Sequence, residues 1–223
     1  QIPGAVRGAF RAMTTGRPGA AHICLPYDLQ KQSLDEAEAW SQPGHDRFPS
    51  QRSRPDAREV ERAAERLAAA RTPVIVGGGG VGLSGACAEL ETLATMLDAP
   101  VCTTVSGKGS LADTHPLNAG VVGTNGGVLS TREVVMQADL VFFIGCRAGS
   151  TTTEHWRYPS REAVILHLDA DGATIGTNYR TDVAMVGDAR LGLADLAEAL
   201  RGRLAGRPRG APGGALLART ARE

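Results

Sequence analysis

The feature that most constrains this chain is a series of short, wholly apolar segments that alternate with amphipathic helical patterns. Beyond residue 55 the apolar segments predict strands, at residues 74–76, 101–105, 140–144, 163–168 and 183–186. Before and between these segments apolar residues recur at helical spacing, as at Val60, Ala64 and Leu67. Strands that are apolar on both faces must be covered on both sides. The pattern therefore predicts an α/β fold, with a parallel sheet and helices on both of its faces.

Composition changes along the chain and predicts its division into parts. Residues 1–30 contain a helical pattern, a Gly-Pro turn and a predicted short strand at 20–25, which together look like the end of a preceding domain. Residues 31–54 are polar and without sustained periodicity, which indicates a linker. We expect residues 55–205 to form the main domain and residues 206–223, rich in Gly, Pro and Arg, to form a flexible tail.

The charge balance excludes some classes of partner. The 24 basic residues equal the 24 acidic ones, which argues against nucleic acid, because phosphate backbones require clustered Lys and Arg. No apolar run approaches the ~20 residues that span a bilayer, so we expect no membrane association. The cysteines lack C-x-x-C spacing and are typical of small buried side chains in a reducing compartment, so we expect a cytoplasmic protein; they are Cys24, Cys87, Cys102 and Cys146. No metal-ligand spacing or catalytic triad can be assigned.

Glycine-rich segments follow two of the predicted strands. Ligands of parallel sheets bind beyond the carboxyl ends of the strands, so these segments are candidate site residues. Gly77, Gly78 and Gly79 would let the backbone approach a phosphate closely, although the same run suits a tight strand-to-helix turn. The long loop at 120–127, which contains Gly123 and Gly126, is of a kind that is usually functional.

Charged residues follow the later predicted strands. Arg147 is placed to pair with a phosphate or to stack on a flat ring, and its alternative role is structural. Asp169 stands where a carboxylate can accept hydrogen bonds from ribose hydroxyl groups. Asp188 is a further candidate, but it also suits the cap of the last helix.

These motifs, taken in order, resemble the thiamine-diphosphate enzymes, and in particular the acetolactate-synthase-like branch. The likeness covers about residues 16–200 and rests on motifs at 15–20, 25–28, 77–79, 106–116, 138–147, 167–176 and 187–188. It implies that residues 1–30 are the C-terminal tail of a pyrimidine-binding domain. It also implies that residues 55–205 are a central domain built on a six-stranded, Rossmann-like parallel sheet.

The resemblance implies a carboligase or decarboxylase, a transferase or lyase that acts on a small-molecule substrate with thiamine diphosphate and Mg²⁺. In such enzymes the pyrimidine- and diphosphate-binding domains hold the cofactor at a dimer interface, so the full-length protein is expected to be a homodimer or tetramer. The central domain holds FAD in some members, ADP in others and nothing in the rest. By position, the nucleotide contacts would come from Gly77, Gly78, Gly79, Gly123, Gly126, Arg147, Asp169 and Asp188.

The sequence departs from the family pattern in ways that affect its expected activity. The activating Glu of the family would precede Gln1, and Gly187-Asp188-Ala189 lacks the last glycine of the Gly-Asp-Gly metal motif. We therefore expect no catalytic residue, no metal ligand and no activity in this chain alone. Residues 148–154 also lack the acidic pair that acetolactate synthases usually carry after the arginine, so the substrate stays open.

Two alternatives remain at this stage. The domain can be purely structural, a spacer with a vestigial nucleotide site between the outer domains. It can also be a free-standing NAD-dependent enzyme of similar fold, such as a sirtuin-like deacylase. The second alternative is disfavoured, because a sirtuin-like zinc site needs two C-x-x-C pairs and the sequence has none.

Overall fold

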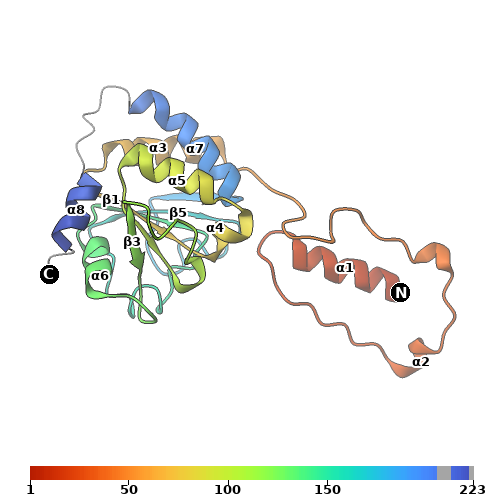
Figure 1. Cartoon of the computed structure of the whole chain (residues 1–223). Helices are drawn as coiled ribbons and strands as arrows, with labels where there is room; N and C mark the ends of the chain where they lie inside the picture. Colours follow the sequence, from red (N-terminus) through yellow and green to blue (C-terminus); the bar gives the residue numbers. More distant parts are fainter. Residues whose placement is uncertain (205–211, 221–223) are drawn as a thin grey trace. The chain divides into compact units, whose positions relative to one another are not determined.

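The computed structural model in Figure 1 describes residues 1–204 and 212–220. The chain divides into two compact units, Gln1–Arg52 and Ser53–Glu223. The boundary between these units falls near the end of the polar segment 31–54.

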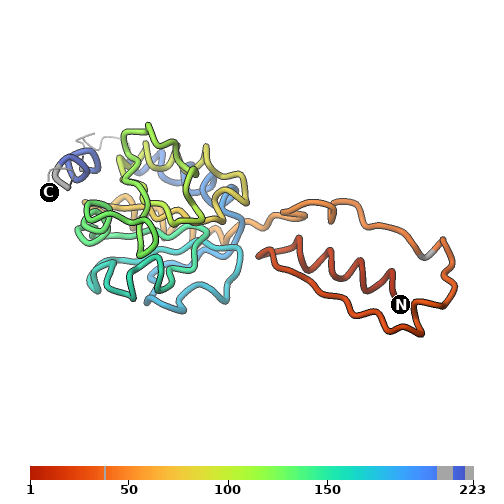
Figure 2. The backbone as a smooth tube through the Cα atoms, turned by 60° about the horizontal axis from the view of Figure 1, so that its bottom comes forward, coloured from red at the N-terminus to blue at the C-terminus, as the bar shows by residue number. Residues whose placement is uncertain are grey.

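The first unit consists mainly of loop. Its helices are α1 (Ile2–Thr14), α2 (Tyr27–Gln30) and the 3₁₀ helix η1 (Glu36–Glu38). Figure 2 shows a long loop that runs around α1, and Thr14 O ties the end of this helix to the loop by accepting from Ser50 N at 2.9 Å. The predicted strand at 20–25 was wrong: these residues form no strand, because no other strand of this unit is there to pair with them.

A six-stranded parallel sheet forms the centre of the second unit, which confirms the parallel sheet that the apolar pattern predicts and the six strands that the family resemblance implies. Its strands are β1 (Pro73–Gly77), β2 (Val101–Thr103), β3 (Asn118–Val121), β4 (Leu140–Ile144), β5 (Val164–Asp169) and β6 (Val183–Val186). They are arranged in the order β3-β2-β1-β4-β5-β6, and every pair is parallel. The strand order reverses between β1 and β4, which is where a sheet of this kind opens a crevice at its carboxyl edge.

Helices cover both faces of this sheet and complete two apolar cores. One core lies beneath α3 (Ala57–Ala69), α5 (Cys87–Leu97) and α7 (Ala189–Arg203), which lie together above the sheet in Figure 1. The other core includes side chains of α6 (Leu129–Met136). Alternate residues of β4 enter the two cores: Phe142 packs in the first and Phe143 in the second. This two-sided burial explains why the strands read as continuous apolar runs.

Short elements follow β1 and β2. Helix α4 (Gly79–Ser84) begins directly after β1 and ends at Gly85, whose φ of 67° is left-handed. The 3₁₀ helix η2 (Val105–Gly107) follows β2. Strand β3 overlaps the start of the predicted glycine-rich loop at 120–127, and the residues alone predicted no strand there. The sixth strand was therefore anticipated only through the family resemblance.

The chain end differs from the flexible tail that the sequence predicts over residues 206–223. Residues 212–220 form helix α8 (Pro212–Thr220), and Leu216 is fully buried in the second core. This apolar contact explains why the segment is helical despite its glycines. The rest of the predicted tail, residues 206–211 and 221–223, lies outside the described residues.

The approach of β1 to β4 gives a test of the fold. A methyl group at Gly78 would lie 2.2 Å from Gly145 O and 2.3 Å from Cys146 Cβ, whereas one at Gly82 in α4 would meet nothing within 4 Å. We expect Gly78→Ala to lower the free energy of unfolding by about 1–3 kcal/mol. Gly82→Ala, the matched control, should leave it unchanged or raise it by up to ~1 kcal/mol. Urea denaturation measures both, and equal stabilities would contradict the packing described.

Candidate functional site at the carboxyl edge of the sheet

The glycines after β1 are packed between two neighbouring chain segments. Gly78 N donates to Ile144 O at 2.8 Å and Gly80 N donates to Gly145 O at 3.0 Å. On the other side, a methyl group at Gly107 would lie 2.2 Å from Gly77 O. These contacts require glycine for the sake of packing, and they already use the N–H groups of Gly78 and Gly80. The geometry favours the tight-turn interpretation of Gly77, Gly78 and Gly79.

The glycine-rich loop after β3 is fastened to the segment that follows β4. Gly123 and Gly126 adopt left-handed φ values of 111° and 102°, and a methyl group at Gly123 would lie 2.3 Å from Thr151 O. Thr124 donates to Thr151 O from its backbone N at 2.9 Å and from its Oγ1 at 3.0 Å. The two loops therefore form one connected rim above β1, β2 and β4.

Arg147 stands apart from the other candidates because its charged group is uncommitted. It is exposed, three residues beyond the end of β4. Within residues 1–204 and 212–220 its guanidinium makes no hydrogen bond or ion pair, while its carbonyl oxygen accepts from Asn178 Nδ2 at 3.0 Å. A positive group with all of its donors available lies at the strand-order reversal, where an anionic ligand would bind.

The two candidate carboxylates already have backbone partners. Asp188 is buried and accepts from Leu191 N at 3.1 Å, so it caps α7, which confirms the cap interpretation of this residue. Asp169 is half-buried, and its Oδ1 accepts from Asp171 N at 2.9 Å. Both contacts stabilise the chain where it leaves a strand.

Sequence reasoning missed the loop that continues from the rim beyond Thr151. Glu154, His155 and Trp156 have consecutive left-handed φ values of 46°, 58° and 61°. The Glu154 carboxylate is largely buried and pairs with Arg132 of α6 at 2.6 Å. Three such residues in a row are strained, and this ion pair holds them in place. The only signal in the sequence was its departure from the family pattern over residues 148–154.

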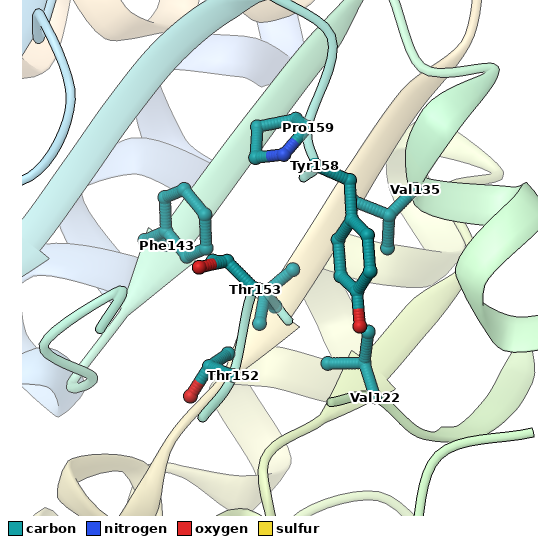
Figure 3. A pocket seen from close by; sticks show the side chains of 8 residues that line it. Val122, Val135, Phe143, Thr152, Thr153, Tyr158 and Pro159 are labelled. Atoms are coloured by element: carbon teal, nitrogen blue, oxygen red, sulfur yellow. The ribbon is translucent and has the colours of Figure 1, made fainter. Parts of the chain in front are cut away.

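A small hollow between this loop and the sheet is mainly apolar. Figure 3 shows Tyr158 and Phe143 on its walls, with Thr153 between them and Thr152 below. The Tyr158 ring is buried, and burial raises the pKa of its hydroxyl to about 12, so the phenol is neutral at physiological pH. The hollow offers apolar contact and no charged group of its own.

His167 of β5 connects the sheet to the chain around Arg147. The side chain is buried, and its Nε2 lies 2.8 Å from Cys146 O, so the ring carries its proton on Nε2 and donates it to this carbonyl. Burial lowers the pKa of His167 below the ordinary histidine value, although the Cys146 carbonyl and Asp169 oppose the shift. The folded protein therefore holds a neutral imidazole at this point.

This buried imidazole predicts a loss of stability in acid. The unfolded chain takes up the proton as the pH falls through about 6.5, but folded His167 takes it up only at a lower pH. The free energy of unfolding should decrease as the pH falls below about 6.5, until the folded pKa is passed. In His167→Gln, whose amide can still donate a hydrogen bond, that decrease should be smaller. Urea unfolding at a series of pH values measures this, and equal slopes for the two proteins would contradict it.

The described residues contain no metal centre and no membrane span. No group of three or more His, Cys, Asp or Glu side chains among them could hold a metal ion, and Asp188 is occupied as a helix cap. Residues 1–204 and 212–220 thus offer no ligand set for the Mg²⁺ that accompanies thiamine diphosphate. None of the helices described here is long and apolar enough to cross a membrane.

Comparisons with known proteins agree with this fold. The family model "Thiamine pyrophosphate enzyme, central domain" matches residues 60–196. A probable acetolactate synthase large subunit from Methanocaldococcus jannaschii is 41% identical over 202 residues, covering 90% of this chain and 34% of that protein. Glyoxylate carboligase from Escherichia coli O157:H7 is 32% identical, covering 88% of this chain and 32% of that protein. The chain spans about a third of the length of these relatives.

Solved structures show the same architecture. Benzoylformate decarboxylase from Polynucleobacter necessarius matches with a TM-score of 0.71 at 21% identity, covering 89% of this chain and 36% of that one. A putative thiamin diphosphate-dependent enzyme from Mycobacterium smegmatis matches with a TM-score of 0.66 at 25% identity, covering 89% and 37%. The sheet order, the strand-end residues and the family model lead to one assignment: the chain belongs to the thiamine pyrophosphate enzyme family and contains its central domain.

Proposed function

We propose that the full-length protein is a thiamine-diphosphate-dependent carboligase or decarboxylase, and that this chain supplies its central domain. The observation that carries the proposal is the match of the family model to residues 60–196. Further support comes from relatives named as a synthase and a carboligase, which match most of this chain. When bound, thiamine diphosphate would stabilise a carbanion beside a carbonyl group. The outer domains of the full-length protein would hold it, together with Mg²⁺.

On this proposal the groups that hold thiamine diphosphate and Mg²⁺ lie in the outer domains and not in this chain. Isothermal titration should show no Mg²⁺-dependent binding of thiamine diphosphate to this chain at micromolar cofactor, because the described residues offer no metal-binding group. Tight, metal-dependent binding would contradict this division of roles.

The activity of the full-length protein is tested separately. Assayed with thiamine diphosphate and Mg²⁺, it should consume at least one member of a panel of 2-oxo acids that includes glyoxylate. The assay without thiamine diphosphate is the control. Consumption of no member of the panel, or equal consumption without the cofactor, would contradict the proposed reaction class.

We further propose that an adenine nucleotide, FAD or ADP, lies across the carboxyl edge of the sheet, with Arg147 on its phosphates or its flat ring. The support is the uncommitted guanidinium of Arg147 next to the strand-order reversal. The committed N–H groups of Gly78 and Gly80 favour the competing architectural function, in which the site is vestigial. On our proposal the side chain of Arg147 supplies the attraction that these glycines do not.

The substitution Arg147→Ala distinguishes the two functions. Losing a charged hydrogen-bonding partner costs about 1.5–3 kcal/mol, so ADP or FAD should bind about 10- to 150-fold more weakly to this variant. The melting temperature of the ligand-free protein should be unchanged, because the guanidinium has no partner to lose among the described residues. Titration calorimetry and thermal unfolding measure the two effects.

A matched control is Arg161→Ala, which removes the same charge. Arg161 is exposed and precedes β5, so it lies at the amino edge of the sheet, away from the proposed site. If millimolar nucleotide fails to raise the melting temperature of the wild type, while Arg147→Ala lowers it by several degrees, Arg147 is structural. The architectural function then replaces the nucleotide site.

A further inference from the structure

The backbone beside Arg147 is held in an unfavourable conformation at Ala148. Gly145 has a φ of 57° and Ala148 a φ of 46°, so left-handed residues flank the Cys146-Arg147 pair. Glycine adopts this conformation readily, but an alanine in it is strained. Ala148 is also buried, with 3% of its surface exposed. Such strain persists only where the surrounding structure enforces it.

The two carbonyl groups between these residues each accept a hydrogen bond from a side chain. His167 Nε2 donates to Cys146 O at 2.8 Å, and Asn178 Nδ2 donates to Arg147 O at 3.0 Å. The backbone adds a third contact, from Gly145 N to Leu168 O at 2.8 Å. Side chains from β5 and from the loop after it thus fix the orientation of consecutive peptide groups.

The histidine is itself held rigidly. Its ring lies 6.0 Å from the ring of Phe143, which stacks on Tyr179 at 5.9 Å. Burying an imidazole is unfavourable unless its polar atoms are hydrogen-bonded, and the Cys146 carbonyl is the partner that the structure provides. An apolar residue would fill the same space without that requirement. The polar side chain at this position therefore has a role beyond filling the core.

We propose that His167 and Asn178 are positioning residues that hold the backbone of Arg147, so that its side chain leaves the chain toward the proposed ligand before the ligand binds. The inference rests on the proposed nucleotide site, since Arg147 acts there. The backbone sets the direction of the Cα–Cβ bond of Arg147, and the ligand then has only the side-chain rotamers to select. Fixing two peptide groups reduces the conformations that binding must select.

A double-mutant cycle with ADP tests the proposal in the whole chain. Asn178→Ala should weaken ADP binding about 2- to 10-fold when Arg147 is present, which is the effect of losing one neutral hydrogen bond. In the Arg147→Ala background the same substitution should have no effect on affinity, because the group that it positions is gone. Equal losses in both backgrounds would overturn the proposal.

Tyr179→Phe is the matched control. It removes the neighbouring hydrogen bond from Tyr179 Oη to Tyr158 O at 2.8 Å and leaves the Arg147 carbonyl untouched. Its ADP affinity should equal that of the wild type. For His167, the variant His167→Gln keeps a donor and should retain affinity, whereas His167→Phe should lose it. If Tyr179→Phe weakens binding as much as Asn178→Ala, the effect is general loosening and the inference fails.

A crystal structure of ligand-free Asn178→Ala separates this inference from the nucleotide proposal. If the wild type binds no ADP, the nucleotide site is wrong, and the structure of the variant alone decides the positioning role. Release of Ala148 from its left-handed φ, with the Arg147 carbonyl turned away, supports that role. An unchanged backbone at both residues would overturn it.

Discussion

The rest of the structure depends on the close approach of the chain after β1 to the chain after β4. Gly78 and Gly80 lie against Gly145 and Cys146 at distances that leave no room for a side chain, and their N–H groups donate to Ile144 O and Gly145 O. These contacts join the two central strands where the strand order reverses. They fix the point from which Arg147 and the following loop leave the sheet.

This approach decides what kind of ligand site the edge can form. In a dinucleotide-binding turn, free backbone N–H groups face the phosphates. Here two of those groups are used inside the protein, and the carboxylates of Asp169 and Asp188 accept from backbone N–H groups. Among the candidate residues in the described part of the chain, Arg147 is the one whose charged group is uncommitted. On our proposal the site depends on this charge, which gives the hydrogen bonds from His167 and Asn178 their importance.

The sequence was sufficient for most of the fold and for only part of the site. Apolar runs such as 140–144 predicted strands well, because burial on both faces leaves a continuous signal. Strand β3 leaves no such signal, since its residues, Asn-Ala-Gly-Val, are only half-buried. Helix α8 depends on the burial of Leu216 in the second core, which no local pattern reveals. The predicted strand at 20–25 was apolar, but a strand also needs a partner.

Prediction of the site residues from the sequence is limited in the same way. Position after a strand singled out Arg147, whose role in a site stays a prediction. Helix chemistry anticipated the cap at Asp188, which the structure confirms. Two contacts join residues that are more than 20 positions apart in the sequence, so no sequence motif predicts them. They are the contacts of His167 with Cys146 and of Arg132 with Glu154. The glycines after β1 fitted both a phosphate loop and a packed turn, and only their neighbours in space distinguish these.

Native mass spectrometry of the purified chain tests most directly whether the domain binds an adenine nucleotide, because it measures the mass of the protein together with any bound ligand. The account predicts one adenine nucleotide per chain, either retained through purification or acquired from millimolar ADP or FAD, and lost on substitution of Arg147. A bare chain under all of these conditions would contradict the account, and would leave the domain as a structural spacer.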